Sequence, residues 1–267
     1  MAHSTDRRQF LAGSLTATVA LGTGTQLASA NDEKVAQEYY ELRTYQIPSS
    51  EKQAVVHDYL ESALIPALRR QRIDRVGVFT QLDKPADVSI FVLIPYPTLD
   101  AVGNRNAQLE SDKAYQQAAA KLFSLPKSDP AYTRINSRFM KAFSGMPVIE
   151  LPETTAAKQP RIFELRTYES HNEEKAALKV DMFNAGEIDI MRDVKMAPVF
   201  YGEMLIGDDV PNLTYMLSAT DMDAHEEHWK GFLSHPEWDR MNKLAKYKDT
   251  VSKITKWYLQ PTPYSHI

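Results

Sequence analysis

The pentapeptide ELRTY occurs twice in this chain, at residues 41–45 and again at residues 164–168. The two copies lie 164 − 41 = 123 residues apart, and a Glu-Lys pair follows each copy at the same distance, at residues 51–52 and 174–175. Self-similarity at a fixed spacing indicates that one structural unit has been duplicated. The chain has 267 residues, of which 43% are hydrophobic. That length suits one large domain or two domains of about 110–130 residues each, and the composition is that of an ordinary soluble globular protein.

Each copy of the repeat predicts the same order of elements. In the first copy, we expect strands at residues 39–46, 76–81, 88–95 and 132–143, and helices at 51–71 and 99–123, the second interrupted near Ser111. In the second copy, we expect strands at residues 161–169, 198–206, 213–218 and 251–260, and helices at 173–192, 222–232 and 237–247. This order, βαββαβ, is typical of a ferredoxin-like domain.

The domain organisation follows from this order. A first repeat over residues 31–144 and a second over residues 161–267 are joined by residues 145–160, a Pro- and Thr-rich stretch that reads as a linker. A four-stranded sheet with both helices on one face leaves its other face bare. Two such sheets can cover each other. The sequence therefore predicts an α+β protein in which the two repeats pack sheet to sheet as a barrel within one chain.

The ELRTY strands present polar side chains on one face, because side chains alternate along a strand. We expect Leu42 and its counterpart Leu165 to face the helices, which sends the Glu-Arg-Tyr side chains toward the barrel interior. So many polar groups in an interior must either pair with one another or serve a ligand, and both interpretations stay open. The candidate catalytic residues are Glu164, Arg166 and Tyr168. The candidate ligand-binding residues are Glu41, Arg43, Tyr45, Tyr201, Glu203 and Tyr215.

Composition excludes several kinds of site. The chain has no cysteine, so it cannot form disulfides, thiolate nucleophiles, Cys-ligated zinc sites or iron–sulfur clusters. Its net charge of −4 means that the chain lacks the excess of Lys and Arg that nucleic-acid binding requires. His225 and His228 stand three residues apart in a heavily charged helical segment, for which we expect a solvated helix face and no metal site. Expected partners are limited to a small-molecule ligand, and the mature chain is expected to be a monomer or a homo-oligomer.

The first thirty residues resemble an export signal. Arg7 and Arg8 precede a moderately apolar run at residues 10–21, and residues 28–30 read Ala-Ser-Ala, a small-residue cleavage site. The apolar run is too short to span a bilayer. The pattern resembles a twin-arginine signal. We therefore expect a periplasmic or secreted protein whose mature chain begins near Asn31.

Several motifs of the second half carry a family resemblance. They are FELRTYES (residues 163–170), PVFYGEMLIG (198–207), PNLTYML (211–217), HPEW (235–238) and LQPTPYSHI (259–267). Together they resemble the NIPSNAP family. The first half keeps YELRTY but has lost the PVFYGE and PNLTYML blocks. The resemblance implies a dimeric α/β-barrel fold, whose wider superfamily includes cofactor-free monooxygenases of quinol-like substrates, haem-degrading enzymes and haem peroxidases.

Three functional hypotheses follow. In the first, the barrel interior binds a small aromatic or quinol-like molecule or oxidises it without a cofactor, with Arg166 stabilising an oxyanion and Glu164 or Tyr168 accepting or donating a proton. In the second, the chain is a non-catalytic binding or scaffold module with an exposed apolar surface on its helices. In the third, it binds haem, for which the nominal axial ligands are His57, His171 and His225.

Overall fold

Eight antiparallel strands close into one barrel in the order β1-β3-β2-β8-β5-β7-β6-β4. The computed structural model describes residues 35–157 and 159–267, so the expected signal peptide lies outside the described residues. The strands are β1 Tyr39–Gln46, β2 Gly77–Gln81, β3 Ile90–Tyr96, β4 Arg134–Ala142, β5 Ile162–Glu169, β6 Pro198–Ile206, β7 Asn212–Ala219 and β8 Lys253–Pro261. The first four strands form one half of the barrel and the last four the other half. The two halves join along β2–β8 and β4–β6.

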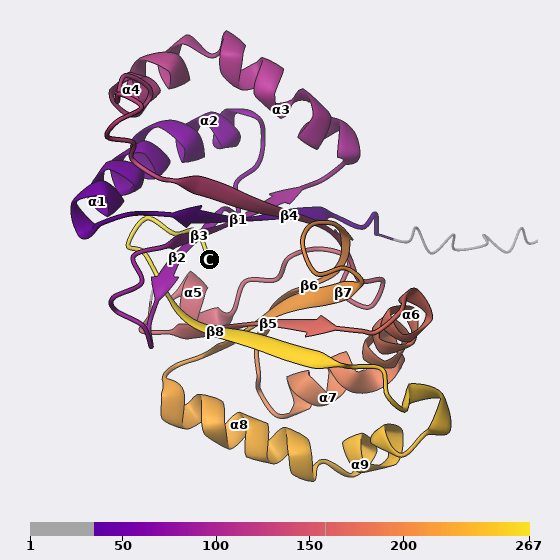
Figure 1. The fold of residues 1–267 in the computed structure, drawn as a ribbon. Coiled ribbons are helices and arrows are strands. Elements are labelled where there is room, and N and C mark those ends of the chain that lie inside the picture. Colours follow the sequence, from indigo (N-terminus) through magenta and orange to yellow (C-terminus); the bar gives the residue numbers. More distant parts are fainter. Residues whose placement is uncertain (1–34, 158) are drawn as a thin grey trace, which may run out of the picture. The chain divides into compact units, whose positions relative to one another are not determined.

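Helices cover the outside of the barrel on two opposite sides (Figure 1). The first repeat contributes α1 Ser50–Tyr59, α2 Ile65–Arg70, α3 Leu99–Ser111 and α4 Lys113–Phe123. The second contributes α6 Glu173–Met182, α7 Ile188–Asp193, α8 Met222–Ser234 and α9 Pro236–Asn242. Each half therefore has the βαββαβ order with its helices on one face of its sheet. The prediction of two ferredoxin-like repeats in one α+β barrel is confirmed. Within the described residues, no helix is long and apolar enough to cross a membrane.

The first four elements of the two repeats follow one another at the same spacing along the chain. Strand, helix, π-helical turn and second helix begin at residues 39, 50, 60 and 65 in the first repeat. The same elements begin at residues 162, 173, 183 and 188 in the second, a constant offset of 123. The π-helical turns are η1 Leu60–Leu64 and η2 Phe183–Glu187. Each residue of one helical layer thus has a defined counterpart in the other.

Side-chain caps fix where the helices begin. Ser49 accepts a hydrogen bond from the backbone N–H of Lys52, and its counterpart Asn172 accepts one from Lys175. The expected interruption near Ser111 is present, because Asp112 leaves helical geometry and caps the start of α4. These local signals explain why the predicted helix positions agree closely with the structure.

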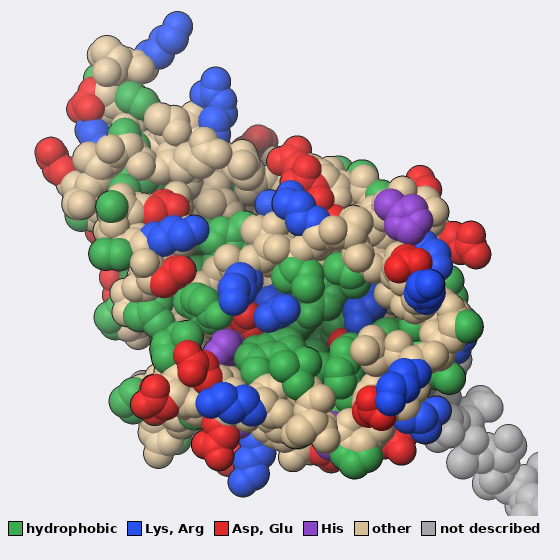
Figure 2. All heavy atoms as spheres, turned by 60° about the horizontal axis from the view of Figure 1, so that its bottom comes forward, with side chains coloured by type: hydrophobic (Ala, Val, Ile, Leu, Met, Phe, Trp, Pro, Cys, Tyr) green, Lys and Arg blue, Asp and Glu red, His purple; other side chains and the backbone are tan. Residues whose placement is uncertain are grey.

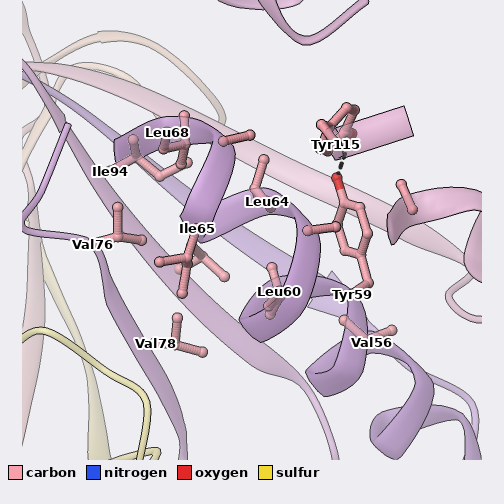
Figure 3. Packing of buried hydrophobic residues seen from close by; sticks show 14 of the residues in the cluster. Val56, Tyr59, Leu60, Leu64, Ile65, Leu68, Val76, Val78, Ile94 and Tyr115 are labelled. Carbon is pink, nitrogen blue, oxygen red and sulfur yellow. Dashed lines mark hydrogen bonds between the residues drawn. The ribbon is translucent and has the colours of Figure 1, made fainter. Parts of the chain in front are cut away.

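Apolar side chains form three layers. One lies between the first repeat's sheet and its helices, where Val56, Leu60 and Leu64 pack on the outer faces of β2 and β3 (Figure 3). Another fills the barrel interior with side chains of both repeats. The residues of the interior layer are Tyr40, Leu42, Phe79, Phe91, Leu93, Met140, Ala142, Ile149, Phe163, Leu165, Val199, Phe200, Met204, Met216, Leu259 and Ile267. The last layer lies under the helices of the second repeat.

The expected orientation of the ELRTY strands is wrong. Leu42 and Leu165 lie in the barrel interior, whereas Tyr45 and Tyr168 pack under the helices of their own repeats. The polar faces therefore point outward, toward the helices. The physical reason is that eight strands enclosing a narrow interior must fill it with apolar side chains. The helices instead supply hydrogen-bonding partners for the polar face.

The segment between the repeats and the end of the chain both pack onto the barrel. The expected linker contains the short helix α5 Glu153–Ala156, and its Ile149 is buried in the interior layer. After β8, the chain crosses to the first repeat, where the N–H of His266 donates to the carbonyl of Val76 at 3.0 Å. Ile267 then enters the interior layer with no exposed surface.

Candidate functional site

A pocket of about 410 Å³ lies between the outer face of the second repeat's sheet and its helices. Figure 2 shows this side of the molecule, over α8 and α9, where hydrophobic side chains gather with Lys and Arg among them. The pocket is lined by Arg166 and Tyr168 from β5, Lys179 and Met182 from α6, Glu187 from η2, Trp229, Phe232 and Leu233 from α8, Trp238 and Asn242 from α9, and by Tyr247, Asp249, Thr250, Val251 and Ile254. We call it the Arg166 pocket.

Glu164 anchors the floor of this region. Its side chain has no exposed surface and accepts a hydrogen bond from Arg166 Nη1 at 2.8 Å on Oε1. The indole N–H of Trp229 donates to Oε2 at 2.8 Å, and His225 Nε2 lies 2.9 Å from the same oxygen. Burial by itself raises the pKa of Glu164, but the bond from His225 and the charge of Arg166 outweigh burial and hold its pKa below 4.5. Glu164 is therefore a fixed carboxylate.

Arg166 is held in place yet keeps donor capacity. Its guanidinium carbon lies 4.3 Å from the Trp229 ring centroid and 5.3 Å from that of Tyr168. Its Nε is buried and has no hydrogen-bond partner among the described residues. An unpaired buried N–H is costly, so this atom favours an added acceptor such as an oxygen of a ligand or of water.

Tyr168 completes the polar part of the sheet face. Its hydroxyl accepts a hydrogen bond from Tyr215 at 2.8 Å, which leaves its own proton to donate elsewhere. Burial raises the pKa of Tyr168, although the nearby Arg166 guanidinium opposes this shift. The tyrosine therefore stays protonated at neutral pH and is a donor, as an oxyanion site requires.

Lys179 and Glu187 form a second buried ion pair at the pocket. Lys179 Nζ lies 2.7 Å from Glu187 Oε2, and their side chains are only 5% and 2% exposed. The ammonium is also 4.8 Å from the Phe183 ring centroid and 5.5 Å from that of Trp238. The pocket thus combines two cations, two carboxylates and aromatic walls.

The first repeat provides a direct comparison for the Glu-Arg pair. Arg43 binds both oxygens of Glu41, through Nε at 2.8 Å and Nη2 at 3.0 Å. Glu41 also accepts from Tyr96 at 2.9 Å, from Ser137 at 2.7 Å and from Arg105. Here the carboxylate and the Nε of the arginine are satisfied within the fold. In the second repeat, His225 and Trp229 occupy one oxygen of Glu164, so Arg166 binds the other oxygen through a single N–H.

The predicted site residues thus fall into separate places. Glu164, Arg166, Tyr168 and Tyr215 come together at or beside the Arg166 pocket. Tyr201 is buried next to them, with its ring stacked on Tyr215. Glu203 is exposed on β6. Glu41 and Arg43 form the network of the first repeat, and Tyr45 packs in that repeat's helical layer.

Four of the residues that sequence reasoning did not assign to the site supply its hydrogen bonds and charges, namely His225, Trp229, Lys179 and Glu187. His225 was expected on a solvated helix face, but it is 6% exposed and bonded to Glu164, so that expectation is wrong for this residue. Its spacing of four from Trp229 places both side chains on one face of α8, a signal that was available in the sequence. Lys179 and Glu187 had no distinguishing pattern, because eight residues along a helix with a π-helical turn is not a recognised spacing.

The histidines do not fit a haem site. His57 Nδ1 lies 2.5 Å from the Tyr264 hydroxyl, His171 is exposed, and His225 is committed to Glu164. His57 lines a separate pocket beside Tyr264, and none of the three lines the Arg166 pocket. In residues 35–157 and 159–267, no cluster of three or more His, Asp or Glu side chains could hold a metal ion.

Comparison with known proteins places the chain in a family. The sequence model of NIPSNAP matches twice, over residues 40–144 and 163–266. This chain belongs to the NIPSNAP family. The two matches show that both halves are NIPSNAP repeats, including the first half with its lost motifs. No curated protein matches this sequence.

Solved structures share the NIPSNAP fold of this chain at low sequence identity. A candidate monooxygenase from Lactobacillus acidophilus is 7% identical, with a TM-score of 0.54, over 84% of this chain and 94% of that one. Another from Fusobacterium nucleatum is 10% identical, with a TM-score of 0.52, over 85% and 93%. An uncharacterised NIPSNAP-like domain protein from Burkholderia xenovorans is 21% identical, with a TM-score of 0.35, over 39% and 88%. The likenesses to the two candidate monooxygenases support the barrel fold.

Proposed function

We propose that the protein binds a small aromatic anion in the Arg166 pocket. The observation that carries this proposal is the Arg166 guanidinium. It lines an aromatic-walled pocket and keeps a buried N–H without a partner among the described residues. A phenolate, enolate or quinol anion would supply the missing acceptor oxygen, and its ring would pack against Trp229, Trp238 and Tyr247.

The rim of the pocket also suits an aromatic ligand. Leu233 is 63% exposed and Ile254 is 49% exposed, so two apolar side chains stand at the mouth. This location replaces the barrel interior that the sequence suggested, because apolar side chains of both repeats fill the interior. The large apolar residues that a scaffold surface would need at 60–68 and 180–191 are buried or half-buried, which removes the observation that would favour the scaffold alternative.

The test is the affinity for 2,4-dinitrophenol, which is ionised at neutral pH, measured by isothermal titration calorimetry on the chain from Asn31 onward. Arg166→Gln should weaken binding at least tenfold, which corresponds to about 1.4 kcal/mol. Arg43→Gln, the matched control in the first repeat, should leave the affinity unchanged. 1,3-Dinitrobenzene, which lacks the oxyanion, should bind weakly to all three proteins. Equal affinities of wild type and Arg166→Gln would refute the proposed site.

Oxidation of the bound anion by dioxygen without a cofactor is a second candidate function. Its support is that two solved structures of the same fold are named as candidate monooxygenases. In this chemistry, Arg166 and Tyr168 would stabilise the substrate as its electron-rich anion, the form that reacts with dioxygen. Dioxygen consumption with a quinol substrate, compared between wild type and Arg166→Gln, tests it. Equal rates in the two proteins would rule out this site as the catalyst.

We also propose that the protein acts in the periplasm after twin-arginine export. The support is the Arg7-Arg8 pair followed by an apolar run and Ala-Ser-Ala. Replacement of both arginines by lysine should leave an unprocessed precursor in the cytoplasm, as seen by fractionation and immunoblotting. Unchanged processing of the variant would contradict this route.

A further inference from the structure

The ion pair between Lys179 and Glu187 is unusual because both charged side chains are buried. Its side chains are 5% and 2% exposed, and their charged atoms are 2.7 Å apart. Moving two charges out of water costs several kcal/mol per ion, and their attraction often fails to offset this cost. A pair of this kind is therefore weak support for the fold and calls for another explanation.

The first repeat shows that the fold does not need this pair. At the constant offset of 123, the counterparts of Lys179 and Glu187 are Val56 and Leu64. Both are fully buried in the apolar layer of the first repeat, beside an equivalent π-helical turn (Figure 3). One chain thus holds an apolar and an ionic version of the same helical layer. The ionic version occurs where the pocket is.

The charges in the Arg166 pocket balance before a ligand enters. Glu164 and Glu187 are carboxylates, and Arg166 and Lys179 are cations, so the formal charge of these four groups is zero. A ligand anion adds one negative charge beside Glu187, whose side chain is only 2% exposed. Such a charge is costly unless a proton enters with it.

Glu187 is the group suited to take that proton. Glu164 is held as a carboxylate by Arg166, His225 and Trp229. Glu187 receives one strong hydrogen bond, from Lys179. Burial raises the pKa of Glu187, and the charges of Lys179 and Arg166 offset only part of this rise.

The other groups around Glu187 do not compete for the proton. Tyr168 from β5 and Tyr201 from β6 interact electrostatically with Glu187. Burial raises the pKa of each tyrosine, so both hydroxyls are already protonated and cannot accept the proton. Arg166 from β5 and Lys179 from α6 are the cations that face it. Asp249 also lines the pocket, but it is exposed to solvent and its charge is screened.

We propose that Glu187 is the proton acceptor of the pocket, so that an aromatic acid binds as its anion between Arg166 and Lys179 while Glu187 gains one proton. This inference rests on the function proposed above and names its ligand class as phenol-type acids. When the ligand enters neutral, its O–H bond breaks and an O–H bond forms on Glu187. When the ligand enters as an anion, the proton comes from solvent. Lys179 remains an ammonium in both cases and turns from Glu187 to the ligand oxygen.

The experiment counts protons during binding. 2,4-Dinitrophenol is titrated into the chain from Asn31 onward by calorimetry in phosphate and in Tris, whose ionisation enthalpies differ. The difference in measured heat gives the number of protons taken up. For the wild type we expect close to one proton, and an affinity that falls by up to tenfold per pH unit as pH rises. Glu187→Gln should take up no proton and should bind with an affinity that is independent of pH.

A second variant covers the case in which Glu187→Gln does not fold. Lys179→Val with Glu187→Leu copies the first repeat. It should lose proton uptake and should bind 2,4-dinitrophenol with an affinity that does not change with pH, while Arg166 keeps the preference for the anion over 1,3-dinitrobenzene. Binding by the wild type without proton uptake, or uptake that persists in Glu187→Gln, would overturn this inference and leave the proposed function standing. Absence of binding by the wild type would overturn both.

Discussion

At the residue scale, the two glutamates of the ELRTY strands show how one side chain can serve two purposes. Glu41 accepts hydrogen bonds from Arg43, Arg105, Tyr96 and Ser137, all of which belong to its own repeat. That network is self-contained. Glu164 instead shares its donors between the sheet and α8, so Arg166 binds it through a single N–H. The same pentapeptide therefore forms a Glu-Arg pair with two hydrogen bonds in the first repeat. In the second repeat, it forms a pair with one hydrogen bond beside a pocket.

Glu164 should make the fold sensitive to acid. Its pKa in the folded protein lies below 4.5, so its contribution to stability is fully present above the pKa of the unfolded state. The contribution is lost as pH falls below 4.5 and through the lower folded pKa. We expect the free energy of unfolding, measured by urea denaturation between pH 7 and pH 3, to fall over this range.

The matched variant is Glu164→Gln, which cannot ionise. It should be less stable than the wild type at pH 7, because a buried charge on Arg166 loses its partner. Its stability should also change less between pH 5 and pH 3. An identical pH dependence in the two proteins would show that other carboxylates cause the acid sensitivity.

The sequence located the polar residues of the site but not the direction in which they point. Strand β3 explains this failure, because all seven of its residues are buried and its pattern IFVLIPY is apolar on both faces. Alternation in β1 and β5 divides the side chains into two sets, yet nothing in those strands says which set the helices cover. The decision depends on His225 and Trp229, which α8 brings to Glu164 from more than sixty residues away.

At the scale of elements, the two π-helical turns are the clearest sign of duplication in the structure. Both η1 and η2 stand between two α-helices at the same offset. A π-helical turn adds one residue to a helical turn and shifts the faces of the residues that follow. Periodicity cannot reveal such a shift, so the sequence predicted one long helix in each repeat. The turn in the second repeat ends at Glu187, which it places under Lys179.

Replacing Lys179 by Val and Glu187 by Leu should not harm the fold. Buried ion pairs exchanged for apolar residues are often neutral or stabilising by about 1–4 kcal/mol. The free energy of unfolding from urea denaturation should therefore be unchanged or higher. Lys179→Val alone should be destabilised by about 3–5 kcal/mol, because it leaves Glu187 buried without its partner. A large loss of stability in the double variant would mean that the ion pair supports the fold.

At the scale of the whole molecule, the barrel depends on contributions from both repeats and from the end of the chain. The sequence predicted the sheet-to-sheet packing, since two bare sheet faces in one chain must be covered. It did not predict that the segment after β8 crosses to the first repeat. That segment hydrogen-bonds to Val76 and Val78, and it delivers Ile267 into the interior.

Ile267→Ala should destabilise the entire barrel. The side chain has no exposed surface and lies among residues of both repeats. Removing its buried atoms should lower the free energy of unfolding by about 2–5 kcal/mol, as for other buried Ile-to-Ala changes. Tyr264→Phe, which keeps the backbone of the same segment, is the control and should cost less. The two values come from urea denaturation followed by circular dichroism. Equal, small losses would show that the segment packs only loosely.

The closed barrel also restricts how a ligand can reach the pocket. Strands β2 and β8, and strands β4 and β6, join the two repeats by backbone hydrogen bonds. These hydrogen bonds oppose a hinge motion that would separate the two halves of the barrel. Helices α8 and α9 pack on the sheet through side chains such as Phe232 of α8 and Trp238 of α9. All residues that line the pocket belong to the second repeat, so a ligand can enter it while the barrel stays closed.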